Sequence, residues 1–175
     1  MPTFIGLLRG INVGGHNKLP MADLRSICEG IRLKDVRTYI QSGNIVFSSE
    51  KTPSRIALEL TAEIDHRFGF APKILILPAD EIRKAAESYP FPTDDHRLSH
   101  IMFLDARPAD DEVAKVNLLK HDPDKLTVGD KAVYFYTPNG ISGSKLDLNK
   151  IERTLGVNVT TRNWRTVQKL IEMAL

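Results

Sequence analysis

The order of the predicted strands and helices constrains this chain more than any single motif. Residues 3–9 are an almost uninterrupted apolar run, typical of a strand covered on both faces, and residues 20–31 have helical spacing. Two strand patterns, 36–41 and 44–48, surround a turn, and a helix from 52 to 69 and a strand at 73–77 follow. This order, strand–helix–strand–strand–helix–strand, is that of a ferredoxin-like fold.

The same order returns in the second half of the chain. Strand patterns at 100–104, 125–128, 132–137 and 157–160 alternate with helix patterns at 109–119 and 144–155, and a further helix follows each half, at 79–88 and 163–175. Between the halves, Pro90, Pro92 and two aspartates interrupt both patterns. We predict an α+β fold of two ferredoxin-like βαββαβ halves, an internal duplication, with halves at 1–90 and 97–175 and a linker at 90–96.

Composition excludes several classes of protein. The 175 residues, 42% of them hydrophobic, suffice for two small cores, and the net charge of +2 gives no bulk attraction to nucleic acid or acidic membranes. The one cysteine, Cys28, lies on the apolar face of a predicted helix, so we expect a buried thiol in a reducing compartment. No apolar run reaches the roughly 20 residues of a membrane span, and no basic segment precedes the N-terminal apolar run. We expect a soluble, cytoplasmic protein.

The connection between the first strand and the first helix contains more glycines and polar residues than a plain link of two to six residues needs. Accessible backbone amides, cations and a helix N-terminus together suit an anion. In a βαββαβ sheet the first and third strands are antiparallel neighbours, so this loop should lie beside the turn that joins the second and third strands. The predicted ligand-binding residues are Arg9, Asn12, Gly14, Gly15, His16 and Lys18 with Gln41, Ser42 and Asn44.

A structural interpretation of these loops stays open. Their asparagine and glutamine side chains could simply hydrogen-bond the backbone of the loops themselves. The glycine spacing matches neither a dinucleotide fingerprint nor a phosphate-binding loop of the Walker type. His16 has a side chain suited to acid–base chemistry near neutral pH, although such a histidine more often only forms a hydrogen bond.

A second candidate site precedes and opens the last helix, at Arg162, Asn163 and Arg165. On a helix, Arg162, Arg165 and Lys169 would share one face and repel one another, which favours an anion, a nucleic acid or an acidic protein as partner. A solvated basic face is the alternative. Trp164 should face the core. Tyr134 and Tyr136 share a strand face, a partial match to RNA-recognition motifs, but the strand at 43–47 lacks the stacking aromatics.

Other patterns are weaker. The loop 139–145 is similar to an anion-cradling turn, although a helix cap formed by Ser144 and Asp147 explains it more simply. The histidines are scattered without the spacing of metal ligands, so we predict no metal site, and no catalytic triad can be argued. The sequence names neither a reaction nor a cofactor.

Three segments carry a family resemblance. Residues 8–21, 39–47 and 160–167 read LRGINVGGHNKLPM, YIQSGNIVF and TTRNWRTV, and they resemble the signature segments of a bacterial family catalogued as domain of unknown function 1697. The resemblance implies an α+β fold of two similar halves and supplies no activity, catalytic residue or cofactor. Our leading hypothesis is binding of a small anion, such as a phosphorylated molecule, at the 9–18 loop and the 41–44 turn. The alternatives are a nucleic-acid or protein interaction through the basic last helix, and loops that only stabilise the fold.

Overall fold

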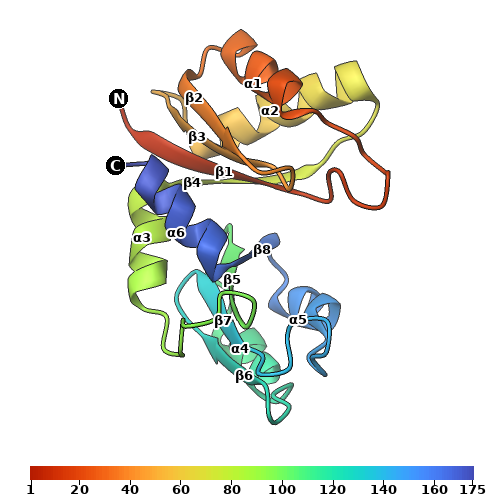
Figure 1. Ribbon diagram of the computed structural model, residues 1–175, viewed down its shortest axis with the longest axis vertical. Helices are drawn as coiled ribbons and strands as arrows, with labels where there is room; N and C mark the ends of the chain where they lie inside the picture. Colours follow the sequence, from red (N-terminus) through yellow and green to blue (C-terminus); the bar gives the residue numbers. More distant parts are fainter. The chain divides into compact units, whose positions relative to one another are not determined.

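The computed structural model describes residues 1–175, and its first four strands form one antiparallel sheet (Figure 1). The strand order is β2-β3-β1-β4, as in a ferredoxin-like sheet, and this confirms the predicted topology of the first half. The elements are β1 (Thr3–Arg9), α1 (Met21–Gly30), β2 (Lys34–Tyr39), β3 (Asn44–Ser48), α2 (Pro53–Phe68) and β4 (Lys73–Pro78).

Local signals explain where the helix α2 begins and ends. Thr52 is its N-cap and accepts a hydrogen bond from the Arg55 amide, and Pro53 occupies the first turn, where its missing N–H costs nothing. The helix ends at Gly69 in a left-handed conformation, φ 77°. Its apolar stripe at residues 56, 60 and 64 is fully buried against the sheet and α1.

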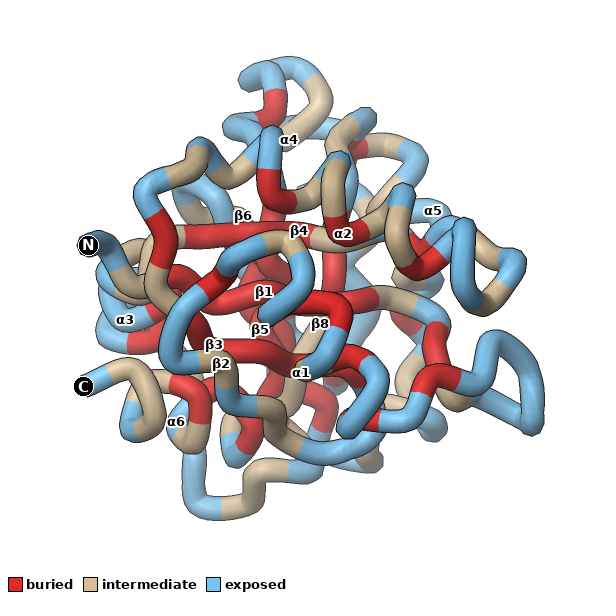
Figure 2. Tube along the Cα trace, turned by 90° about the horizontal axis from the view of Figure 1, so that it is seen from above, coloured by how far each residue is buried: buried red, intermediate tan, exposed pale blue.

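Both faces of the first sheet are covered, as the continuous apolar pattern of β1 predicts. Phe4, Leu8 and Phe47 pack in the cluster beneath α1 and α2. Ile5, Leu7 and Val46 point to the opposite face and are nevertheless 0% exposed. Figure 2 shows the trace of β1 and β3 as buried. Cys28 is also fully buried, and burial raises the pKa of its thiol to about 12, which fits the expected unreactive thiol.

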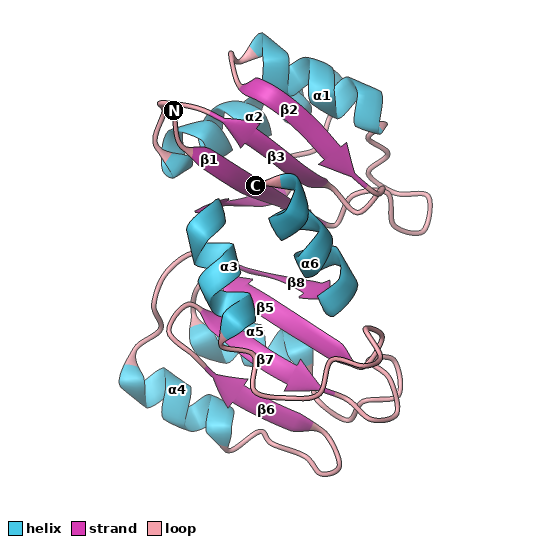
Figure 3. Cartoon of the chain, turned by 60° about the vertical axis from the view of Figure 1, so that its left-hand side comes forward, coloured by secondary structure: helices cyan, strands magenta, loops and turns pink.

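The second half repeats the topology with different residues (Figure 3). Its sheet has the order β6-β7-β5-β8, again with antiparallel neighbours, which confirms the duplication. One face of this sheet forms a core with α4 and α5. The elements are β5 (Ser99–Leu104), α4 (Asp110–Asn117), β6 (Lys125–Val128), β7 (Ala132–Tyr136), α5 (Leu148–Leu155) and β8 (Val159–Asn163).

A helix follows each half, α3 (Ala79–Glu87) after β4 and α6 (Trp164–Met173) after β8. The chain divides into two compact units, Met1–Ile82 with Leu170–Leu175, and Arg83–Lys169. The division therefore falls within α3 and α6, rather than at the expected linker 90–96. None of the helices combines the length and the apolar character needed to cross a membrane.

Two predicted boundaries near the C-terminus are wrong. The helix expected from residue 144 begins at Leu148, where Asp147 is the N-cap and accepts a hydrogen bond from the Lys150 amide at 3.0 Å. Ser144 instead donates to the carboxylate of buried Asp124 at 3.0 Å, so the 139–145 loop is anchored by a tertiary contact. The last strand extends to Asn163 and places Arg162 in β8 instead of on a helix.

Candidate functional site

The loop after β1 and the turn between β2 and β3 lie against each other, as the sheet topology predicts. The Leu8 amide donates to the Gly43 carbonyl at 2.8 Å, and the side-chain amide of Asn12 donates to the Gln41 carbonyl at 2.8 Å. These bonds join residues about 30 positions apart in the chain. The two polar segments, 9–18 and 41–44, therefore form one structural feature, which we call the loop pair.

Asn12 is the centre of the loop pair. Its Nδ2 donates to the carbonyls of Leu19 and Gln41, and its Oδ1 accepts from the Leu19 amide at 2.8 Å. Both amide hydrogens and the oxygen are thus engaged within the protein. The residue has φ 54°, a left-handed conformation that asparagine tolerates better than most side chains. Asn12 therefore holds the loop pair in one geometry.

The tip of the first loop is a tight hairpin. Val13 and His16 face each other in a short β-bridge, and the His16 amide donates to the Val13 carbonyl at 2.9 Å. Gly14 and Gly15 between them have φ 57° and 76°, and two successive positive values define the turn that glycine pairs favour. Below the tip, the Asn17 side chain donates to the Gly10 carbonyl at 3.0 Å. The loop is ordered by its own backbone.

The second loop is fixed from beneath. Asn44 is fully buried and donates to the Tyr39 carbonyl and the Ser42 hydroxyl, both at 3.0 Å. Gly43 has φ 89°, and a Cβ there would lie 2.7 Å from the side chain of Ile11. Glycine is therefore required at position 43, because any side chain would collide with the base of the first loop.

These contacts divide the predicted site residues into two groups. Asn12, Asn44 and Ser42 use their side chains to build the loop pair. In contrast, the side chains of His16, Lys18 and Gln41 are exposed and form no hydrogen bond or ion pair within the protein. Arg9 is half-buried and takes part in an interaction of its own.

The charge around the loop pair is positive. No aspartate or glutamate occurs in residues 1–22 or 36–49, and Lys73 of β4 lies opposite Arg9 in the sheet register. The helix α1 begins after Pro20 without a side-chain cap, so the amides of its first turn receive no side-chain acceptor there. Asp23, in that first turn, is the first acidic residue of the chain.

The predicted residues of the second unit have other environments. Arg162 donates to the Thr160 hydroxyl at 2.8 Å and the Thr161 carbonyl at 3.1 Å, and burial lowers its pKa to about 10, so it stays charged at neutral pH. Asn163 accepts a hydrogen bond from the Thr166 amide at 2.9 Å and caps α6. The expected basic helix face was therefore wrong in one respect: Arg162 precedes the helix, which carries exposed Arg165 and half-buried Lys169.

Of the two tyrosines that could have stacked on nucleic-acid bases, Tyr134 is buried and Tyr136 is half-buried. Tyr134 is only 5% exposed, and the ring of Tyr89 lies 5.8 Å from it and 5.1 Å from Trp164. Phe91 lies 6.3 Å from Tyr136 in the same way. Trp164 belongs to this cluster but is only half-buried, whereas a core position was expected. The strand face that partly matched an RNA-recognition motif is thus occupied by the protein's own side chains.

Two cavities of the first unit were not predicted. One is a groove of about 850 Å³ beside the edge strand β2, which residues 174–175 also line. The other, about 380 Å³, lies where the C-terminal end of α1 faces α2, and there hydrogen bonds from Lys51 and then Arg55 lower the pKa of Glu59. Neither is lined by the loop pair. No group of three histidine, cysteine or acidic side chains is placed to hold a metal ion.

Comparisons with known proteins agree with this description. A family model described as "Protein of unknown function (DUF1697)" matches residues 1–134. The structure of conserved bacterial protein SP0830 from Streptococcus pneumoniae is similar, with a TM-score of 0.78 and 26% identity over 99% of each chain. No curated protein matches the chain. Since the family model covers well over half of its length, the chain belongs to the DUF1697 family of proteins of unknown function.

Proposed function

We propose that the first unit binds a small anion, such as a phosphorylated or carboxylated molecule, at the loop pair. One observation carries the proposal. Asn12 forms three hydrogen bonds, two to Leu19 at the end of the first loop and one across to Gln41 in the second, while the neighbouring side chains of His16, Lys18 and Gln41 form no hydrogen bond or ion pair within the protein. An ordered surface whose donors are not used internally is suited to bind a ligand, because little conformational freedom is lost on binding.

Each residue then has a definite role. Asn12, Asn44 and Ser42 position the loops, and Gly14 and Gly15 allow backbone amides to approach a ligand closely. Lys18 and Arg9 supply positive charge, and His16 and Gln41 supply further hydrogen bonds. Arg162, Asn163 and Arg165 belong to the second unit, and their contribution to ligand binding stays a separate prediction.

A ligand panel tests the proposal. Thermal unfolding is measured with nucleotides, sugar phosphates, inorganic phosphate and small carboxylates, because a ligand that binds only the folded state raises the melting temperature. We expect at least one anion to stabilise the wild-type protein. Lys18→Gln should weaken its binding about tenfold, as expected for loss of one charge-assisted hydrogen bond. Lys120→Gln, at an exposed lysine without partners in the second unit, is the matched control.

Two outcomes would contradict anion binding. If no anion shifts the melting temperature, the loop pair serves the fold alone. If short RNA stabilises the protein and the effect disappears steeply as salt increases, a polyanion interaction replaces the small-molecule site, because a single phosphate contact responds far less to ionic strength.

A further inference from the structure

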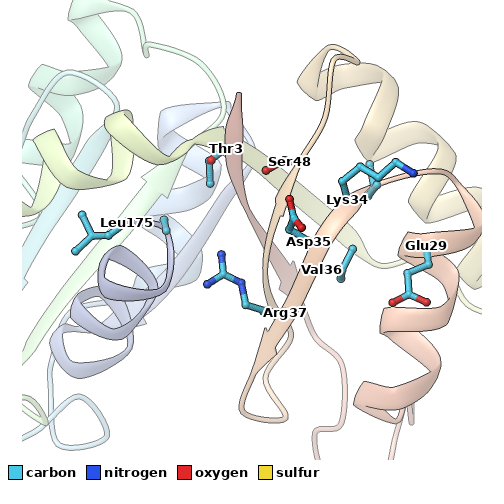
Figure 4. Close-up of a pocket in the computed structure, with 10 residues that line it drawn as sticks. Thr3, Glu29, Lys34, Asp35, Val36, Arg37, Ser48 and Leu175 are labelled. Atoms are coloured by element: carbon cyan, nitrogen blue, oxygen red, sulfur yellow. The ribbon is translucent and has the colours of Figure 1, made fainter. Parts of the chain in front are cut away.

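The groove beside β2 is a second candidate site, separate from the loop pair. Its volume of about 850 Å³ is within the range of small-molecule sites in proteins. It is lined by residues 33–37, by Thr3 and Ser48 on the neighbouring strands, and by the end of the chain at 174–175 (Figure 4). β2 is an edge strand, so this side of the sheet is not closed by a further strand.

A β-bulge shapes the wall of the groove. The register between β2 and β3 shifts between Lys34 and Arg37, and Asp35 within the bulge has φ 52°. On a regular strand, side chains two positions apart share a face, so Asp35 and Arg37 would be neighbours of opposite charge. The bulge separates them, and Figure 4 shows the carboxylate and the guanidinium pointing in different directions. No ion pair forms between these two residues.

The polar side chains of the groove are without partners. Lys34, Arg37, Asp35 and Glu29 are exposed and form no side-chain hydrogen bond or ion pair, and neither do the half-buried hydroxyls of Thr3 and Ser48.

The smaller cavity differs in this respect. There Lys51 donates to the Ile31 carbonyl at 2.6 Å and pairs with Glu59, which also accepts from Arg55 at 2.8 Å. The charged side chains Lys51 and Glu59 of the smaller cavity are therefore paired with each other, whereas the charged side chains of the groove form no ion pair.

The charges of the groove determine what it can hold. Two cationic and two carboxylate side chains line it, so the side-chain charges cancel, in contrast to the positive loop pair. An anion would be attracted by Arg37 and repelled by Asp35. A molecule with a carboxylate and an ammonium group complements both.

We propose that the groove binds a small zwitterion with a free amino and a free carboxylate group, such as a short peptide. The guanidinium of Arg37 holds the carboxylate and Asp35 holds the ammonium group, with an apolar side chain against the half-buried Val36. This proposal does not depend on the anion site.

The test uses alanyl-leucine and its two blocked forms, N-acetyl-alanyl-leucine and alanyl-leucinamide. Binding is followed by the backbone amide shifts of residues 33–37 in nuclear magnetic resonance spectra of the full chain. We expect the free dipeptide to bind and each blocked form to bind about tenfold more weakly, because each lacks one charged partner. Equal shifts with all three compounds, or no saturable shift at millimolar concentration, would overturn the proposal.

Two substitutions assign the charged partners. Arg37→Gln should make the dipeptide and its amide bind equally, and Asp35→Asn should do the same for the dipeptide and its acetylated form. Asparagine tolerates the left-handed conformation, so the second change preserves the bulge. Arg153→Gln, at an exposed arginine without partners in the second unit, is the control. The zwitterion assignment is also refuted if the Arg37→Gln and Arg153→Gln variants bind the dipeptide with equal affinity. It is refuted as well if inorganic phosphate binds in the groove with the same affinity as the dipeptide.

Discussion

Replacing Asn12 by alanine should destabilise the first unit clearly more than the same replacement of Asn17 on the same loop. The substitution removes three hydrogen bonds, two to Leu19 and one to Gln41. A net value of about 1 kcal/mol for each gives a loss of about 3 kcal/mol, reduced where water replaces the lost partner at this half-buried position. Alanine at φ 54° adds about 1 kcal/mol of backbone strain, so we expect a total of about 2–4 kcal/mol.

The assay is urea unfolding followed by far-ultraviolet circular dichroism. A loss of that size should lower the melting temperature by roughly 4–16 °C, at 2–4 °C per kcal/mol for a chain of this length. Asn12→Gly, which removes the side chain without the strain, should be about 1 kcal/mol less destabilising than Asn12→Ala.

Asn17→Ala is the matched control for this prediction. Asn17 has nearly the same backbone conformation, φ 53°, but its side chain forms a single exposed hydrogen bond, to Gly10. We expect it to cost about 1–2 kcal/mol. If Asn17→Ala destabilises the protein as much as Asn12→Ala, or if Asn12→Ala changes stability by less than about 0.5 kcal/mol, Asn12 does not hold the two loops together.

Two further predictions concern packing and pH. Gly43→Ala should cost about 2–4 kcal/mol in urea unfolding, because its methyl group would lie 2.7 Å from Ile11 at a positive φ; Gly15→Ala, with no atom within 4 Å of the added Cβ, should cost only about 1 kcal/mol, and equal losses would refute the packing argument. Burial, and secondarily His96, lowers the pKa of His100 below its usual 6.5, so the unfolded chain binds the proton first and the free energy of unfolding should fall as the pH drops below about 6.5. His100→Gln should weaken this dependence between pH 6.5 and 5.5, and an unchanged profile for this variant would contradict the assignment.

The position of the loop pair could be predicted from sequence because it depends only on strand order. Once the βαββαβ pattern is recognised, antiparallel pairing of β1 and β3 is expected to bring residues 9–18 beside residues 41–44. The hydrogen bond from Asn12 to the Gln41 carbonyl joins these two segments in the structure. The duplication could be predicted for the same reason, since each half carries its own alternation of strand and helix patterns.

The errors arise where tertiary contacts outweigh local patterns. Ser144 and Asp147 are equally good N-cap residues, and the contact of Ser144 with Asp124, 20 positions earlier, decides between them. β8 continues through Thr161 and Arg162 because the backbone of these residues pairs with β5. The sequence has no apolar pattern there from which this pairing could be predicted.

The groove could not be predicted from the sequence, because its lining combines a bulge in β2 with residues 174–175, which are distant from β2 in the chain. The helical position expected for Arg162 was wrong for a related reason: helical spacing of the arginines was assumed before the start of the helix was known.

A phosphate titration of the wild-type protein and of Asn12→Gly, followed through the backbone amides of Gly14, Gly15 and Lys18, tests the central claim most directly. Inorganic phosphate is the simplest anion that the loop pair should bind. We predict saturable shifts at these amides in the wild-type protein and at least tenfold weaker binding in Asn12→Gly, whose fold is checked by unchanged amide signals in α2 and β4 of the same unit. Shifts that do not saturate, or equal affinity in the two proteins, would contradict a preorganised anion site at the loop pair.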